Sequence, residues 1–381
     1  MSSAPQPQPR AEAVGIARRR CIAVGMGGIA RVVVPALARR PWVEIAGVVD
    51  VRQDALQLGR DLLALPDGAS FTELDAALAA LDADTALIHT PSEWHYEQCR
   101  SSLAAGLDVL VAKPISNSFA AAERLVAQAE AAGRSLAVGQ QVRYHRHYRA
   151  VARFVASGEL GTPESVTLLN SKPRHRALNL TELDQPALYE MACHHFDILM
   201  AIFPAAAPLR ICCDGFRPSW SVYAGPCMVN ALIECSGGLH VLYHGGFSSQ
   251  SDHYELRIEG TRGVLRCRGI HMSNDSMEYE FAARGGKFGR REDLDAGIGT
   301  ADPFERFFDI WYEYLRGGAE PPWSGRNNLK VFALLSAAID SIAAGGWVEV
   351  AGSERYAAAF RHPGPWAASL TSAGSVSPAA G

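Results

Sequence analysis

The segment from Tyr189 to Met200 holds the side chains best suited to proton chemistry. If it forms a helix, Glu190, His194 and Asp197 lie at i, i+4 and i+7 and share one face. Ionisable groups in an otherwise apolar segment are costly to bury unless they face a cleft or one another, and an imidazole titrates near neutral pH. The residues alone leave two interpretations open: a proton-transfer site, or a solvated helix edge whose histidine is satisfied inside the fold.

A second candidate is Lys113, which stands between an apolar strand, Asp108 to Val111, and Pro114. Proline cannot continue a central strand because it has no N–H to donate, so Lys113 is expected at the strand's end. In an open α/β sheet, ligands bind beyond the carboxyl ends of the strands. We therefore interpret Lys113 as a functional residue rather than as an ordinary surface lysine.

The element that would hold a cofactor at this edge is the stretch from Arg19 to Ala30, RRCIAVGMGGIA. An apolar strand leads into G-x-G-x-x-A and then an apolar helical run, which is the order of the first βα unit of a dinucleotide-binding domain. Gly25 allows a tight turn, Gly27 admits a pyrophosphate to the backbone amides, and Ala30 lets the helix pack closely on the sheet. The predicted cofactor contacts of this turn are Gly25, Met26, Gly27, Gly28, Ile29 and Ala30.

The next predicted strand, Val43 to Val49, ends at Asp50, twenty positions after Ala30. An acidic side chain there accepts hydrogen bonds from both ribose hydroxyls and repels a 2′-phosphate, which favours NAD over NADP. Arg52 weakens that preference. A third strand, Thr85 to Thr90, opens onto the segment PSEWH. The remaining predicted cofactor contacts are Asp50, Arg52, Thr90, Pro91, His95 and Lys113.

Length, charge and cysteine usage exclude several classes of function. At 381 residues the chain can form two domains, and a net charge of -4 with a pI near 6.3 indicates neither nucleic acid nor a membrane surface as partner. The eight cysteines show no metal-ligand spacing, so we expect a cytoplasmic protein with reduced thiols and no metal. The segment Arg18 to Arg20 is similar to a twin-arginine export signal. Cleavage after such a signal would remove the nucleotide-binding turn, which argues against export.

In order and spacing, the motifs between residues 20 and 200 resemble the glucose-fructose oxidoreductase and inositol dehydrogenase (Gfo/Idh/MocA) family. The similar stretches are GMGGIA, VVD, TPSEWHYEQC, KP, VGQQVRYHRHY and YEMACHHFD. The resemblance implies an α/β fold with an N-terminal Rossmann domain, then an α+β domain with a large, mostly antiparallel open sheet, and homodimers or homotetramers. The expected limits are a flexible leader at 1–18, the NAD-binding domain at 19–145, the substrate and oligomerisation domain at 146–351, and a flexible tail at 352–381.

The resemblance also implies a catalytic set. In the family, the first acid and the histidine of a D-x-x-x-H-x-x-D segment lie beside the nicotinamide, together with the lysine of an E-K-P segment. Carried over by position, these are Glu190, His194 and Lys113, with no metal. His194 would be the general base, Lys113 would stabilise an alkoxide, and Glu190 would orient His194 or bind a neighbouring hydroxyl. Two positions depart from the pattern: Ala112 replaces the glutamate of E-K-P, and Glu190 replaces an aspartate.

The expected function is an NAD(P)-dependent oxidoreductase that acts on a secondary hydroxyl of a sugar, a cyclitol or a sugar-derived natural product. One alternative is a redox-neutral glycoside-cleaving enzyme of the same fold, which would use nearly the same residues. A second is a regulator that binds the nucleotide without turnover, against which Lys113 and His194 argue. The expected substrate contacts are Arg143, Tyr144, Lys172, Arg174, His175 and His194.

Overall fold

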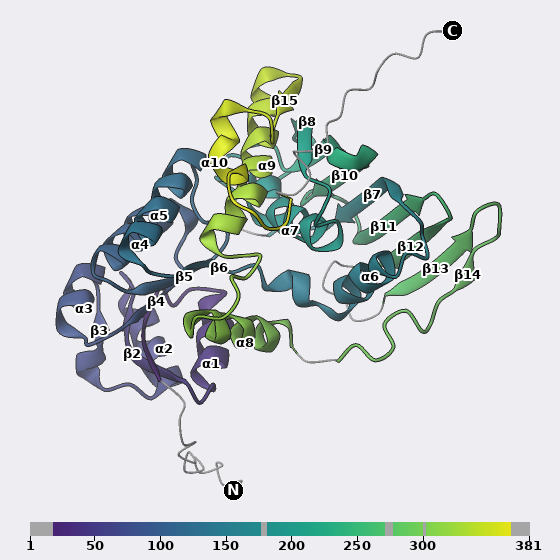
Figure 1. Ribbon diagram of the computed structural model, residues 1–381. Helices are drawn as coiled ribbons and strands as arrows, with labels where there is room; N and C mark the ends of the chain where they lie inside the picture. The colour runs from purple at the N-terminus through teal and green to yellow at the C-terminus, as the bar shows by residue number, and fades with distance from the viewer. Residues whose placement is uncertain (1–17, 177–180, 271–276, 300–301, 367–381) are drawn as a thin grey trace, which may run out of the picture. The chain divides into compact units, whose positions relative to one another are not determined.

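The computed structural model describes residues 18–176, 181–270, 277–299 and 302–366 (Figure 1). Nearly all of the predicted leader and the last part of the predicted tail, residues 367–381, lie outside these ranges. The chain divides into two compact units, residues 1–112 with 128–136, and residues 113–127 with 137–381. None of the helices in the described ranges is long and apolar enough to cross a membrane.

The first sheet has six strands in the order β3-β2-β1-β4-β5-β6. Strands β1 to β5 pair in parallel, as the predicted dinucleotide-binding domain requires. The strands are β1 (Arg19–Val24), β2 (Val43–Val49), β3 (Ser70–Phe71), β4 (Thr85–Ile88), β5 (Asp108–Val111) and β6 (Leu136–Val138). The helices are α1 (Ala30–Ala38), α2 (Gln53–Leu63), α3 (Leu74–Ala80), α4 (Ser92–Ala104) and α5 (Phe119–Ala132), and a 3₁₀ turn spans Asp67–Ala69.

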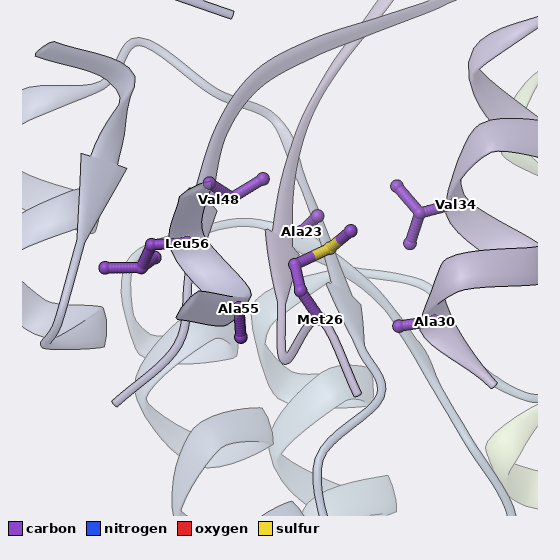
Figure 2. Close-up of a cluster of buried hydrophobic side chains, with 7 residues drawn as sticks. All are labelled: Ala23, Met26, Ala30, Val34, Val48, Ala55 and Leu56. Atoms are coloured by element: carbon purple, nitrogen blue, oxygen red, sulfur yellow. The ribbon is translucent and has the colours of Figure 1, made fainter. Parts of the chain in front are cut away.

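A cluster of small and medium apolar side chains forms the core beneath the glycine-rich turn. Ala30 of α1 is fully buried in it, so the last small residue of the motif lets α1 lie close to the sheet as predicted. Gly59 of α2 serves the same purpose, because an added Cβ would come within 3.0 Å of Met26 Cγ and 3.3 Å of Val48 Cγ1. Figure 2 shows the cluster, which comprises Ala23, Met26, Ala30, Val34, Val48, Ala55 and Leu56.

The second sheet has nine strands in the order β14-β13-β12-β11-β7-β10-β9-β8-β15. Its neighbouring strands pair antiparallel except for β7 with β10, which confirms the predicted large, mostly antiparallel sheet. The strands are β7 (Pro163–Ser171), β8 (Pro208–Phe216), β9 (Met228–Cys235), β10 (His240–Gly246), β11 (His253–Gly260), β12 (Gly263–Gly269), β13 (Glu278–Ala283), β14 (Gly289–Arg290) and β15 (Trp347–Glu349).

Helical segments of the second unit carry most of the residues discussed below. The α-helices are α6 (Arg146–Ala156), α7 (Cys193–Ile202), α8 (Pro303–Leu315), α9 (Gly325–Ala344) and α10 (Ala357–Phe360). Short 3₁₀ turns span Gln141–Tyr144, Ser236–Gly238 and Glu354–Tyr356, and a π-helical turn, Leu188–Ala192, leads directly into α7. Asp302 caps α8 by accepting a hydrogen bond from the Phe304 N–H at 2.8 Å, and Pro303 lies in the first turn, where proline is favoured.

Two boundaries differ from the sequence-based expectation. The predicted flexible tail is wrong for residues 352–366, which contain the last 3₁₀ turn and α10, with Tyr356, Phe360 and Trp366 buried. The Trp366 indole donates to the Phe203 carbonyl at 3.1 Å, so three scattered aromatic residues anchor a stretch whose composition is otherwise typical of a loop. The third strand ends at Ile88 rather than at Thr90, and most of the segment PSEWH is already helical, because α4 begins at Ser92.

Candidate functional site

The glycine-rich turn of the first unit has the shape that a dinucleotide needs. Gly25 has a φ of +84°, and a Cβ at that position would lie 2.9 Å from Thr90 Cγ2 and 3.0 Å from the His89 carbonyl carbon, so only glycine fits. Beside Gly27 and Gly28 there is no heavy atom within 4 Å of an added Cβ. No side chain caps the N-terminus of α1, which begins after Ile29. An uncapped helix start beside open glycines fits a pyrophosphate.

Asp50 is held against this turn by two backbone groups. Its Oδ2 accepts a hydrogen bond from the Met26 N–H at 2.9 Å, and its Oδ1 accepts one from the Arg52 N–H at 3.0 Å. The carboxylate keeps further lone pairs for the ribose hydroxyls of NAD. The Arg52 guanidinium is exposed, with Nε 3.9 Å from Asp50 Oδ1. The side chain of Met26 is buried in the core, so only its backbone faces the turn.

Two more of the predicted cofactor contacts are engaged with each other. His95 is buried in the first turn of α4, and its Nε2 lies 2.9 Å from the Thr90 carbonyl oxygen. The Thr90 hydroxyl in turn donates to Gln98 Oε1 at 2.5 Å. We therefore assign His95 the role of positioning the segment around Thr90 and Pro91, because its ring is not available at the surface.

In the second unit, Lys113 and Glu190 form a close ion pair. Lys113 Nζ lies 2.7 Å from Glu190 Oε2, and the two side chains are 17% and 25% exposed. Burial opposes the charge on the ammonium group, but the neighbouring Glu190 carboxylate outweighs it, so the pKa of Lys113 is raised. Lys113 is therefore a fixed cation at neutral pH. The peptide bond between Lys113 and Pro114 is cis.

His194 lies in the same cluster and is oriented by Gln140. Its Nδ1 is 3.1 Å from Gln140 Oε1, while Gln140 Nε2 donates to the Cys193 carbonyl at 3.4 Å. Because the amide oxygen of Gln140 can only accept, His194 must carry its proton on Nδ1, which leaves a lone pair on Nε2. Burial and then the positive charge of Lys113 lower the pKa of His194 well below its usual value, so the ring is neutral at pH 7.

Gln140 is a candidate site residue that the sequence did not single out. It lies 54 positions before its partner His194. The only signal was its place in the VGQQVRYHRHY stretch, two residues after the end of β6. An amide fixing a histidine tautomer has no sequence pattern of its own.

The predicted single helical face of Glu190, His194 and Asp197 is wrong for Asp197. Glu190 lies in the π-helical turn and His194 in the first turn of α7, whereas Asp197 points into the core. There Asp197 forms a two-pronged ion pair with Arg143, with Nε–Oδ2 and Nη2–Oδ1 distances of 2.8 Å. Arg143 is only 5% exposed, so we remove it from the expected substrate contacts.

The other expected substrate contacts fall into two groups. Tyr144 is half-buried, and its hydroxyl accepts a hydrogen bond from the Trp323 indole at 2.8 Å, so it serves the fold. Lys172 and Arg174 follow β7, where their backbone N–H groups donate to the carbonyl oxygens of Gly246 and Phe247 at 2.9 Å. Their positive charges also contribute to the lowered pKa of His194, which places them close to the cluster of Lys113, Glu190 and His194. His175 is exposed.

In the described part of the chain, no group of three or more histidine, cysteine, aspartate or glutamate side chains could hold a metal ion. The first unit thus carries a nucleotide-binding turn, and the second unit, described by itself, carries a cluster of ionisable groups. A parallel sheet with this turn, followed by an α/β unit that carries such a cluster, defines the class of two-domain, dinucleotide-dependent oxidoreductases.

Comparison with known proteins places the chain within that class. The family model described as "Oxidoreductase family, NAD-binding Rossmann fold" matches residues 19–140, and that of the "C-terminal alpha/beta domain" matches residues 153–350. The chain thus belongs to the Gfo/Idh/MocA oxidoreductase family, as the resemblance predicted. It is an oxidoreductase of CH–OH groups with NAD as its cofactor.

Individual relatives cover most of the chain. An inositol 2-dehydrogenase of Streptomyces avermitilis is 36% identical over 286 residues, which cover 72% of this chain and 78% of the relative. An oxidoreductase from Agrobacterium radiobacter, solved with NAD+, L-tartaric acid and magnesium, has a TM-score of 0.76 at 20% identity over 87% of this chain and 98% of that one. An inositol dehydrogenase homolog from Azotobacter vinelandii, solved with NADH and myo-inositol, has a TM-score of 0.73 at 18% identity over 87% and 98%.

Proposed function

We propose that this protein transfers a hydride between NAD and a secondary hydroxyl of a sugar, a cyclitol or a sugar-derived natural product, with Lys113, Glu190 and His194 as its catalytic residues. One observation carries the proposal: a lysine held in its charged form lies in the same cluster as a histidine held in its neutral form. Oxidation of an alcohol needs both, a cation to stabilise the oxygen as it loses its proton and a base to take that proton.

Lys113 is the group suited to the substrate oxygen. The pKa of the ammonium is raised, so Lys113 cannot serve as the base near neutral pH, but it can donate a hydrogen bond to a hydroxyl and then to the alkoxide. Glu190, 2.7 Å away, fixes the position of the ammonium. The second oxygen of the Glu190 carboxylate can accept a hydrogen bond from a neighbouring hydroxyl of a polyol.

His194 is the group suited to accept the proton. The hydrogen bond between Nδ1 and Gln140 leaves the lone pair of Nε2 as the basic atom. When the proton arrives at Nε2, the Gln140 oxygen still accepts from Nδ1 and stabilises the imidazolium. The charge of Lys113 opposes the imidazolium, which keeps the ring deprotonated before each turnover. Bound NAD supplies the hydride acceptor for oxidation.

The names of relatives support the substrate class. Curated relatives include an inositol 2-dehydrogenase, a D-apiose dehydrogenase and a 1,5-anhydro-D-fructose reductase, all of which are named for sugars or cyclitols. A screen of sugars and cyclitols with NAD+ tests the proposal by the appearance of NADH in proportion to oxidised product. H194A should abolish this turnover and leave the affinity for NAD within a few fold. Product without net NADH would indicate glycoside cleavage, and NAD binding without turnover of any compound would indicate a regulator.

We also propose that the protein is a cytoplasmic homodimer or homotetramer formed through the open sheet. Paired residues form a row across β15, β8, β9 and β10, namely Trp347, Cys212, Leu232 and Leu242. Leu232 and Leu242 are 49% and 45% exposed, and Trp347 is 43% exposed. Exposed apolar side chains in one row favour burial against another surface. Light scattering should give a mass of two or four chains, and L232E should reduce it to that of one chain; a monomeric wild-type protein would refute the proposal.

A further inference from the structure

We propose that Lys172 and Arg174 bind a carboxylate of the substrate, so that the enzyme acts on acidic sugars or polyols in preference to neutral ones. This inference rests on the function proposed above, because it names the class of substrate for the same site. It depends on where the two side chains lie, on the charge balance around them, and on the way the guanidinium is held.

Lys172 continues a row of residues that faces the catalytic segment. In extended chain, residues at i and i+2 point to the same side. Asn170, two residues before Lys172, is fully buried, and its Nδ2 lies 2.9 Å from Met191 Sδ and 3.3 Å from His195 Nε2. Met191 lies in the π-helical turn with Glu190, and His195 follows His194 in α7. The strand therefore turns this row toward the segment that carries the catalytic groups.

The charges in this region do not balance. The positive charges of Lys113, Lys172 and Arg174 all lower the pKa of His194. Of these three cations, Lys113 is paired with Glu190. Within the described ranges, neither Lys172 nor Arg174 forms an ion pair. The pairing of His253 with Ser171 places Asp252 beside Lys172 on the neighbouring strand, but Asp252 is exposed and makes no ion pair with it. In the described ranges, Lys172 and Arg174 are thus two cations without an ion pair, although the exposed Asp252 carboxylate acts electrostatically on Lys172.

The Arg174 guanidinium is held in a way that suits a carboxylate. Its central carbon lies 4.7 Å from the centroid of the Phe247 ring, which is fully buried. A ring beneath the guanidinium uses its face and leaves the N–H groups at its edge available, and those N–H groups match the two oxygens of a carboxylate. Burial and the charge of Arg174 lower the pKa of Lys172 to about 8, and the Asp252 carboxylate offsets only part of this.

A neutral polyol would leave both cations unpaired when it displaced water from the site, whereas a carboxylate would pair with them. Charge-assisted hydrogen bonds of this kind change affinity by about ten- to a hundredfold. The cofactor's pyrophosphate is the other anion available. We assign Lys172 and Arg174 to the substrate because their charges lower the pKa of His194, and because the charge of Lys113 lowers the pKa of Lys172. His194 and Lys113 are the residues that handle the reacting hydroxyl in the proposed function.

The experiment uses matched neutral and acidic sugars with the full-length protein. D-glucose is compared with D-glucuronate, and D-galactose is compared with D-galacturonate. Each compound is tested for NADH formation and, by calorimetry, for binding to the NAD-saturated protein. Glucose 6-phosphate tests whether a phosphate can take the place of the carboxylate. The variants are R174Q, K172M and R174K, and R176Q is the control because Arg176 is exposed. Thermal unfolding of each variant checks that it folds.

For the wild type, we expect each sugar acid to bind about ten- to a hundredfold more tightly than its neutral partner. This ratio should fall toward one in R174Q and K172M, should be partly retained in R174K, and should not change in R176Q. The larger effect should be on KM rather than on kcat, because the contact is made before and during the reaction alike.

Three results would overturn the inference. The sugar acids could bind no more tightly than the neutral sugars, or glucose 6-phosphate could bind more tightly than both sugar acids. The third result is that R174Q binds NAD more weakly while its binding of sugar acids is unchanged. Failure of the proposed function would look different. In that case no compound would form NADH, yet D-glucuronate would still bind more tightly than D-glucose and R174Q would remove the difference.

Discussion

Replacement of Lys113 by methionine tests the catalytic assignment most directly. Methionine keeps an unbranched stem but removes the ammonium group that lies 2.7 Å from Glu190 Oε2. Two unit charges at that separation attract each other by about 6 kcal/mol at an effective dielectric constant of 20, and desolvation offsets part of this. The attraction prevails, since the pKa of Lys113 is raised. Loss of one charged donor to a developing oxyanion lowers kcat by about 100- to 1000-fold, which is the decrease we expect for K113M.

The same variant should shift the pH profile. If His194 is the base, the acid limb of kcat/KM in the wild type should reflect its protonation and should lie below the usual histidine pKa of about 6.5, because burial and the charge of Lys113 lower that pKa. Removal of the positive charge makes protonation easier, so the pKa of His194 rises and the acid limb moves to higher pH. Initial rates of NADH formation across the pH range measure both effects. A folding defect would lower the rate without moving the limb.

The matched control is K287M, which makes the same substitution at an exposed lysine. It should leave both the rate and the acid limb unchanged. If kcat/KM of K113M stayed within about threefold of the wild type, Lys113 would not stabilise the alkoxide. If thermal unfolding showed K113M to be folded and its rate fell while the acid limb remained in place, His194 would not be the titrating base, and the roles in the cluster would need to be reassigned.

Two further predictions concern the cofactor and the core. D50N keeps the shape of Asp50 but removes its charge, so KM for NAD+ should rise about tenfold and the preference for NAD+ over NADP+ should become smaller. Initial rates with both cofactors measure this preference, and an unchanged preference would show that Asp50 does not select the cofactor. R143M leaves Asp197 buried and unpaired, so the free energy of unfolding in urea should fall by about 3–5 kcal/mol, and R143M/D197L should recover part of this loss. A stable R143M with impaired substrate binding would return Arg143 to the substrate contacts.

The nucleotide-binding half was predictable because its signals are local. The tight turn at Gly25, the burial of Ala30 and the acid after β2 each depend on residues within one βα unit, and the structure has all three features. The large, mostly antiparallel second sheet was expected from the family resemblance, and the structure has it.

Prediction failed where a side chain's partner is distant in sequence. Asp197 shares a helical spacing with His194, and nothing nearby indicates that Arg143, 54 residues earlier, draws it into the core. Gln140 was missed for the same reason, and so were the partners of Trp366 in the last described segment. The positions of Lys172 and Arg174 were expected to matter, but their lack of acidic partners is a property of the folded arrangement that no motif displays.

The π-helical turn at Leu188–Ala192 makes the catalytic segment sensitive to length as well as to residue type. Such a turn accommodates one residue more than regular α-helical geometry, and it often occurs at functional positions. Deletion of one residue here would let the segment relax into an ordinary helix and rotate Glu190 away from Lys113, while the hydrophobic residues of α7 kept their packing. A laboratory or natural variant shortened by a single codon at this point should therefore remain folded and lose its ion pair while both Lys113 and Glu190 are still present in the chain.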